Sequence, residues 1–172
     1  MKPPTKKQKG DFAELKVACD LRRRGYLVLI PFGEEAPYDI VIDRDGRLER
    51  VQVKYADRKG AASVEVRCYS QTVISGKVRS ITPYTADSID WLALYEATSD
   101  RCCYIPAAEL GTGRMRLTMR FAPTANNQAR KIRFADRYLD LQDPNSRLAE
   151  ESMEPAGLEP APSDLQNRRS PN

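Results

Sequence analysis

An Asp-Gly pair at positions 45 and 46 constrains the fold of this chain more than any other feature, because it separates two stretches rich in aliphatic residues. Asp-Gly favours the type I′ turn, whose positive φ angles match the right-handed twist of antiparallel strands. Residues 38–44 and 47–56 are therefore expected to form the two strands of a β-hairpin. In such a two-residue loop Arg44 pairs with Arg47, which fixes the register of the whole ribbon.

This register brings three polar side chains together. Asp39 is expected directly opposite Gln52, with their Cβ atoms roughly 5 Å apart. Lys54 lies on the same face as Gln52 and diagonal to Asp39, because side chains alternate along a strand. An acid, an amide and an amine that converge between apolar positions are typical of a metal site. The alternative is a solvent-exposed hairpin face that carries Arg50, Gln52 and Lys54.

A helix is expected over residues 11–24, which contain no proline and end before Gly25, a residue suited to a left-handed cap. At about 100° per residue, Glu14 falls in the middle of an apolar face that includes Val17 and Leu21. Burial of an unpaired carboxylate is costly, so Glu14 needs a cation, a metal or hydrogen-bond donors as a partner. The alternative is a slightly rotated helix from which Glu14 reaches solvent.

The remaining pattern predicts further strands and two more helices. Strands are expected at residues 26–31, 63–69, 90–96, 101–106 and 115–121. A short helix is expected to begin at Pro106 and end at Leu110. A basic helix is expected over residues 126–139. The stretch that contains Gly76 and Lys77 is expected to be a polar connection.

Composition excludes several classes of protein. The chain has 172 residues but no apolar run near the roughly 20 that span a bilayer, so no membrane protein is expected. Histidine is absent, which excludes Ser-His-Asp triads and histidine-ligated zinc. No apolar segment follows the N-terminal lysines, so a cytoplasmic protein is expected. Four cysteines without C-x-x-C spacing are expected to be buried reduced thiols: Cys19, Cys68, Cys102 and Cys103.

Charge and composition divide the chain into three parts. Residues 143–172 contain six acidic and three basic residues, a net charge of −3, and since the whole chain carries +4, the first 142 residues carry +7. This excess of positive charge favours a polyanionic partner. We expect residues 1–9 to be a flexible basic arm, residues 10–142 to be the folded domain, and residues 143–172 to be a disordered tail rich in Pro, Ser and Glu.

The order of these motifs resembles the signature of the PD-(D/E)XK nucleases. The matching residues are Glu14 on the helix, Pro37-Tyr38-Asp39 before the hairpin, and Gln52-Val53-Lys54 on its second strand. Gln52 stands where the family usually has Asp or Glu, and this Q-x-K variant is similar to intron-encoded homing endonucleases of the class. The resemblance covers about residues 9–140. It implies an α/β fold with a restriction-endonuclease-like core, a mixed β-sheet flanked by helices.

The resemblance also implies a metal-dependent, site-specific DNA endonuclease with Glu14, Asp39, Gln52 and Lys54 as catalytic residues. Mg²⁺, or Mn²⁺ in its place, would be held by Glu14, Asp39, Gln52 and the carbonyl of Val53. Lys54 would orient the attacking water or stabilise the charged transition state. A homodimer or homotetramer is expected, because one such site cuts one strand of double-stranded DNA. DNA contacts are expected from Lys59, Lys77, Arg79, Asn126, Gln128, Arg130 and Lys131.

Two alternatives remain open from the sequence. The first is another nuclease of the same fold, similar to a Holliday-junction resolvase or a restriction enzyme. The second is a DNA-binding module with an impaired active site, because the neutral Gln52 removes one negative charge from the standard metal site.

Overall fold

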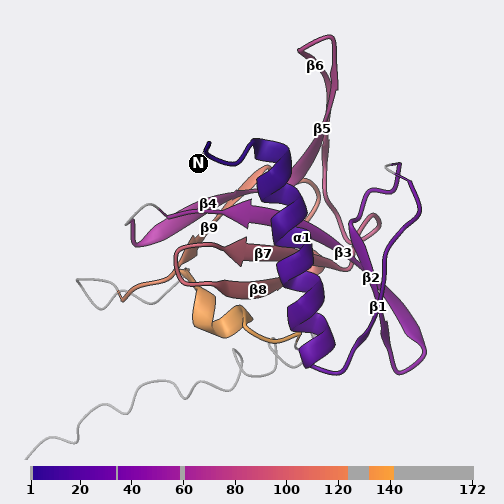
Figure 1. Cartoon of the computed structure of the whole chain (residues 1–172), viewed down its shortest axis with the longest axis vertical. Helices are drawn as coiled ribbons and strands as arrows, with labels where there is room; N and C mark the ends of the chain where they lie inside the picture. The colour runs from indigo at the N-terminus through magenta and orange to yellow at the C-terminus, as the bar shows by residue number, and fades with distance from the viewer. Residues whose placement is uncertain (1, 34, 59–60, 124–131, 142–172) are drawn as a thin grey trace, which may run out of the picture. The chain divides into compact units, whose positions relative to one another are not determined.

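The core of the domain is a five-stranded mixed sheet, seen in a computed structural model that describes residues 2–33, 35–58, 61–123 and 132–141 (Figure 1). Its strands are β1 (Leu27–Leu29), β2 (Ile40–Arg44), β3 (Arg47–Ala56), β7 (Trp91–Glu96) and β8 (Arg101–Pro106). They are arranged in the order β1-β2-β3-β7-β8. β3 and β7 run parallel, and the other neighbours are antiparallel. The expected mixed sheet of an α/β fold is confirmed.

The β2–β3 hairpin has the predicted turn and register. Asp45 and Gly46 have φ angles of 52° and 85°, as a type I′ turn requires. Arg44 pairs with Arg47 and Ile40 pairs with Val51. The next position outward therefore places Asp39 opposite the residue that follows Val51 on β3.

Helix α1 (Lys6–Arg23) begins five residues earlier than predicted. The Thr5 hydroxyl accepts a hydrogen bond from the Gln8 amide N–H at 3.3 Å, and the Gln8 side-chain oxygen accepts one from the Thr5 N–H at 2.8 Å. This capping box fixes the first turn, so the expectation of a flexible arm is wrong for residues 6–9. The helix ends as predicted, with Gly25 at φ 92° and the Tyr26 N–H bonded to the Leu21 carbonyl at 3.2 Å.

α1 covers one face of the five-stranded sheet, as Figure 1 shows. Ala13, Val17 and Leu21 recur every four residues on the helix and are completely buried. They pack in one hydrophobic cluster with sheet residues that include Val51 and Trp91. The side chains of β3 that alternate with this set, Gln52 and Lys54 among them, consequently face the opposite side of the sheet.

The second face of the sheet packs against a three-stranded sheet and two short 3-10 helices. The strands are β4 (Ser63–Arg67), β9 (Arg116–Arg120) and β10 (Arg133–Phe134), and the helices are η1 (Ala107–Leu110) and η2 (Ala135–Tyr138). Leu92 and Leu94 of β7 share a buried cluster with Val66 of β4 and Met119 of β9. Among the described residues, α1 is the only α-helix that flanks the sheet.

Two of the predicted segments have a different structure. The polar connection around Gly76 is a projecting hairpin of β5 (Tyr69–Ile74) and β6 (Lys77–Pro83), turned by Ser75 and Gly76 at φ 51° and 74°. The prediction of a basic helix over residues 126–139 is wrong for its C-terminal part. That part forms β10 and η2, in which Ala135 and Tyr138 are buried. Residues 124–131 lie outside the described residues, as does the tail predicted for 143–172.

All four cysteines are free thiols, and Cys68 and Cys103 are buried as predicted. Cys19 is exposed, so the expectation of a buried thiol is wrong there, because it lies on the solvent side of α1. Within the described residues, no helix combines the length and apolar character needed to cross a membrane.

Candidate active site

Asp39 immediately precedes β2, and backbone hydrogen bonds hold it against β3. Its N–H donates to the Val51 carbonyl at 3.0 Å, and its carboxylate oxygen Oδ2 accepts from the Val53 N–H at 2.7 Å. The same oxygen accepts a hydrogen bond from the side-chain amide of Gln52. The Gln52 amide nitrogen also donates to the Val53 carbonyl at 3.3 Å. Asp39 and Gln52 thus meet across the hairpin, as its register predicts.

Lys54 extends along the same face of β3 and ends at the side chain of Tyr84. Its Nζ donates to the Tyr84 hydroxyl at 2.9 Å and lies 5.0 Å from the centre of the tyrosine ring. Burial lowers the pKa of Lys54, although the negative charges of Asp39 and Glu14 act to raise it. Those opposing charges show that the ammonium group lies within electrostatic reach of both carboxylates.

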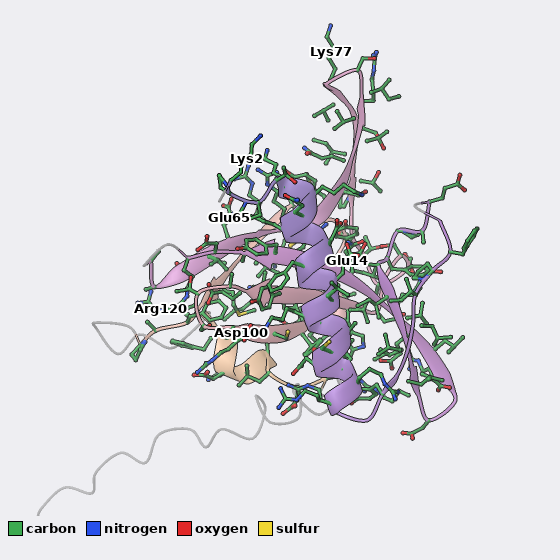
Figure 2. The ribbon with its side chains drawn as sticks, viewed as in Figure 1. Lys2, Glu14, Glu65, Lys77, Asp100 and Arg120 are labelled. Carbon is green, nitrogen blue, oxygen red and sulfur yellow. The ribbon has the colours of Figure 1, made fainter. Side chains whose placement is uncertain are left out.

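Glu14 projects from α1, the helix that packs against β3 (Figure 2). It is half-buried and lies beside the stripe of Ala13, Val17 and Leu21, so its predicted place in the middle of the apolar face is wrong. The stripe repeats every four residues, which turns Glu14 to the edge of the buried face. Burial and the charge of Asp39 raise the pKa of Glu14.

The donor set of this group fits a hard divalent cation. Burial also raises the pKa of Asp39, so the ionisation of both carboxylates is disfavoured and a nearby cation would favour it. The described residues contain no cluster of three acidic, thiol or imidazole side chains suited to a metal. A cation held here would therefore take its further ligands from neutral oxygens, which the Gln52 amide and the Val53 carbonyl could supply and which Mg²⁺ accepts. The Gln52 amide has to turn first, because its nitrogen faces Asp39.

The comparisons with known proteins agree with this chemistry. The sequence model of the PD-(D/E)XK endonucleases matches residues 4–141 of the chain. The chain belongs to this family. A solved structure described as a bacterial homing endonuclease, I-Ssp6803I, is similar with a TM-score of 0.63 and 22% sequence identity, over 87% of this chain and 95% of that one. This likeness confirms the fold. A search of curated proteins gave no match.

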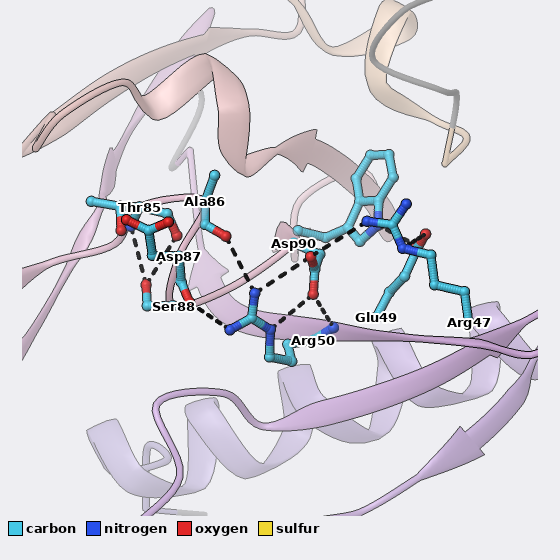
Figure 3. Close-up of polar contacts among 9 residues, drawn as sticks. Arg47, Glu49, Arg50, Thr85, Ala86, Asp87, Ser88 and Asp90 are labelled. Carbon is cyan, nitrogen blue, oxygen red and sulfur yellow. Dashed lines mark hydrogen bonds and ion pairs between the residues drawn. The ribbon is translucent and has the colours of Figure 1, made fainter.

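In this PD-(D/E)XK family member, a segment that sequence reasoning missed lies over the polar face of β3. Arg50 donates to the Asp87 carbonyl at 2.6 Å and to the Ala86 carbonyl at 3.2 Å, and its Nε bonds the Asp90 carboxylate at 2.9 Å (Figure 3). Asp90 and Arg50 are also joined through their backbones, with the Asp90 N–H 2.9 Å from the Arg50 carbonyl. The solvent-exposed hairpin face considered as an alternative is therefore wrong, and Gln52 is only 8% exposed.

The structure brings together four of the site residues predicted from the sequence and separates others. Asp39 and Gln52 meet across the hairpin, Val53 contributes its backbone, and Lys54 lies on the same face of β3, while Glu14 on α1 acts on Asp39 and Lys54 through its charge. Lys77 and Arg79 are exposed on the β5–β6 hairpin, and Lys77 lies at its far end (Figure 2). The other expected DNA contacts lie outside the described residues: Lys59, Asn126, Gln128, Arg130 and Lys131.

Proposed function

We propose that this protein is a divalent-metal-dependent endonuclease of homing type that hydrolyses phosphodiester bonds at specific sites in double-stranded DNA. One observation carries the proposal: the β2–β3 hairpin joins Asp39 to Gln52 and places Lys54 on the same face of β3, where the charges of Asp39 and of Glu14 on α1 act on it. Family membership supports nuclease activity, and members of the family generally use divalent metal ions.

Each residue of this group has a role in the proposed reaction. Asp39, Glu14, the Gln52 amide oxygen and the Val53 carbonyl would hold Mg²⁺ or Mn²⁺. The bound metal would supply Lewis-acid polarisation of the scissile phosphate and a lowered pKa for the attacking water. Lys54, in its ammonium form, would donate hydrogen bonds to the phosphate oxygens, on which negative charge develops in the transition state.

The partners of the Gln52 amide favour a second candidate, a DNA-binding protein that does not cleave. The amide nitrogen donates to Asp39 and to the Val53 carbonyl, which are two of the oxygens that a metal would need. If the amide keeps this orientation, the site lacks one oxygen ligand and metal affinity falls. Binding of DNA without Mg²⁺- or Mn²⁺-dependent cutting would select this candidate.

The β5–β6 hairpin is the proposed DNA-contacting element within the described residues. It carries Lys77 and Arg79 but no acidic residue, and nearly all of its residues are exposed. A two-stranded ribbon of this kind fits the major groove of B-DNA. Because one site cuts one strand, we further propose that two protomers act together in a dimer or tetramer to cut both strands.

A cleavage assay on a panel of DNAs tests this function. The purified protein is incubated with plasmid, random-sequence duplex, branched and single-stranded DNA, with Mg²⁺, with Mn²⁺ and with neither. We expect metal-dependent cuts at a few positions of duplex DNA. Preferential cutting of branched DNA would instead indicate a resolvase-like enzyme, and metal-independent or absent cutting would contradict the proposal. Sedimentation of the protein with its duplex gives the number of protomers.

A further inference from the structure

We propose that Tyr84 is a positioning residue for Lys54. The hydroxyl group of Tyr84 fixes the direction of the Lys54 ammonium group at the active site. The geometric part of this inference stands on the contacts of Tyr84 alone. The catalytic part rests on the nuclease function proposed above.

The contact is specific in direction. The Lys54 Nζ lies 2.9 Å from the Tyr84 hydroxyl oxygen and 5.0 Å from the ring centre. The ammonium group therefore lies closer to the hydroxyl edge than to the centre of the ring, and the hydrogen bond is the closer of its two contacts with Tyr84. Tyr84 is 3% exposed, so water does not compete freely for this bond.

Tyr84 is itself held on both sides. Its N–H donates to the Cys68 carbonyl at 2.9 Å, which ties it to the end of β4. The residues that follow are closed by a turn in which the Ser88 and Ile89 N–H groups donate to the Thr85 carbonyl. Arg50 then binds this turn to β3 (Figure 3). Strand β3 thus carries both Lys54 and Arg50, and Arg50 anchors the segment that follows Tyr84.

Lys54 needs such a partner. A lysine side chain is flexible, and a partly buried ammonium group needs hydrogen-bond acceptors. Among the described contacts, Lys54 bonds Tyr84 and forms no ion pair with Asp39, although the charge of Asp39 acts on it. Because the Tyr84 hydroxyl holds the ammonium group, Lys54 does not occupy the Asp39 carboxylate, which stays available to a cation. Burial raises the pKa of Tyr84, so the group remains a neutral hydroxyl that accepts from Lys54.

The test compares Tyr84→Phe with Tyr138→Phe. Tyr138 is a buried tyrosine of the same hydrophobic cluster, and its hydroxyl donates to Glu109 at 2.8 Å, so the control loses a comparable hydrogen bond. Single-turnover cleavage with Mg²⁺ gives the rate of the chemical step, and DNA affinity is measured separately without metal. We expect Tyr84→Phe to lower the cleavage rate about tenfold and to leave DNA affinity within twofold. Tyr138→Phe should change neither.

A second readout does not depend on cleavage. The metal-free, DNA-free protein is treated with an amine-reactive acetylating reagent, and the modification of each lysine is followed by peptide mass spectrometry. Lys54 of the wild-type protein should react at least tenfold more slowly than the exposed Lys77, and Tyr84→Phe should accelerate its reaction several-fold.

Each outcome decides the inference. Equal reaction of Lys54 and Lys77 in the wild-type protein, or unchanged reaction of Lys54 in folded Tyr84→Phe, would overturn the geometric part. Faster modification with an unchanged cleavage rate would overturn the catalytic part. If the wild-type protein cleaves no DNA, the proposed function fails, and the modification rates alone still show whether Tyr84 fixes Lys54.

Discussion

Gln52 and Asp39 hold each other across the β2–β3 hairpin, because the Gln52 amide nitrogen donates to the carboxylate oxygen that also accepts from the Val53 N–H. In the absence of metal, this amide acts as a neutral cap on a buried carboxylate. A glutamate at the same position could not donate this bond when ionised. The neutral amide therefore satisfies the Asp39 carboxylate without placing a second negative charge beside it.

Gln52→Glu tests whether the neutral amide at this position stabilises the metal-free protein. Without metal, a second carboxylate opposite Asp39 should destabilise the protein by about 2 kcal/mol, a decrease in Tm of about 5 °C for a domain of this size. Mg²⁺ or Mn²⁺ should then raise the Tm of the variant more than that of the wild-type protein, because the cation neutralises the added charge. Thermal denaturation with and without metal measures both effects.

The matched control for this experiment is Gln71→Glu, which places the same change on an exposed glutamine of β5. It should alter neither the Tm nor its response to metal. Equal responses to metal in the Gln52 and Gln71 variants would contradict a metal site at Gln52.

The basic end of the β5–β6 hairpin predicts a salt-dependent contact with DNA. Lys77→Ala should weaken binding to all sequences alike and reduce the slope of log K against log salt by about 1, because one phosphate contact is lost. Arg116→Ala is the control, because this exposed arginine already pairs with Glu65 at 2.7 Å. Titrations of DNA at several salt concentrations give the slopes. An unchanged slope for the Lys77 variant would remove the hairpin from the DNA interface.

Glu96 predicts the acid sensitivity of the fold independently of the active site. Burial opposes its charge, but hydrogen bonds from Ser99 and Thr98 outweigh burial and lower the pKa of Glu96 from its usual 4.5 to about 2. Its contribution to stability is therefore present above pH 4.5 and is lost as the pH falls through about 2. The Arg58 guanidinium, with its Nε 3.1 Å from the carboxylate, adds to this contribution.

Glu96→Gln should therefore be less stable than the wild-type protein by about 2 kcal/mol at pH 7. The difference should become smaller as the pH falls below 4.5, where the wild-type protein loses the same contribution. Urea denaturation across this pH range measures it, with the exposed Glu65→Gln as the control. A difference that stays constant with pH would show that the charge of Glu96 does not stabilise the fold.

Local sequence was sufficient to predict the part of the site that lies on the hairpin. The Asp45-Gly46 turn fixes the pairing of Arg44 with Arg47, and the period of two along each strand then places Asp39 against Gln52. The start of α1 was also readable, because Thr5 and Gln8 have the spacing of a capping box. The basic charges of residues 1–9 favour a flexible arm, but the capping box outweighs them from Lys6 onward.

Tyr84 could not have been predicted in the same way. It reaches Lys54 because β3 and β7 pair in parallel and Arg50 binds the segment that precedes β7. Both are contacts between residues far apart in sequence, which no local pattern encodes. The β5–β6 hairpin was missed for a different reason: both of its faces are exposed, so burial leaves no alternation of apolar and polar residues.

DNA cleavage by Asp39→Asn compared with Asp45→Asn tests most directly whether Asp39 belongs to a metal-dependent nuclease site. Both variants replace an aspartate of the hairpin by its neutral isostere, and asparagine tolerates the positive φ of the turn position well. We expect Asp39→Asn to remain folded and to bind DNA but to lose at least about 100-fold in metal-dependent cleavage, while Asp45→Asn cleaves like the wild-type protein. Wild-type cleavage by a folded Asp39→Asn variant would show that Asp39 is not part of the nuclease site.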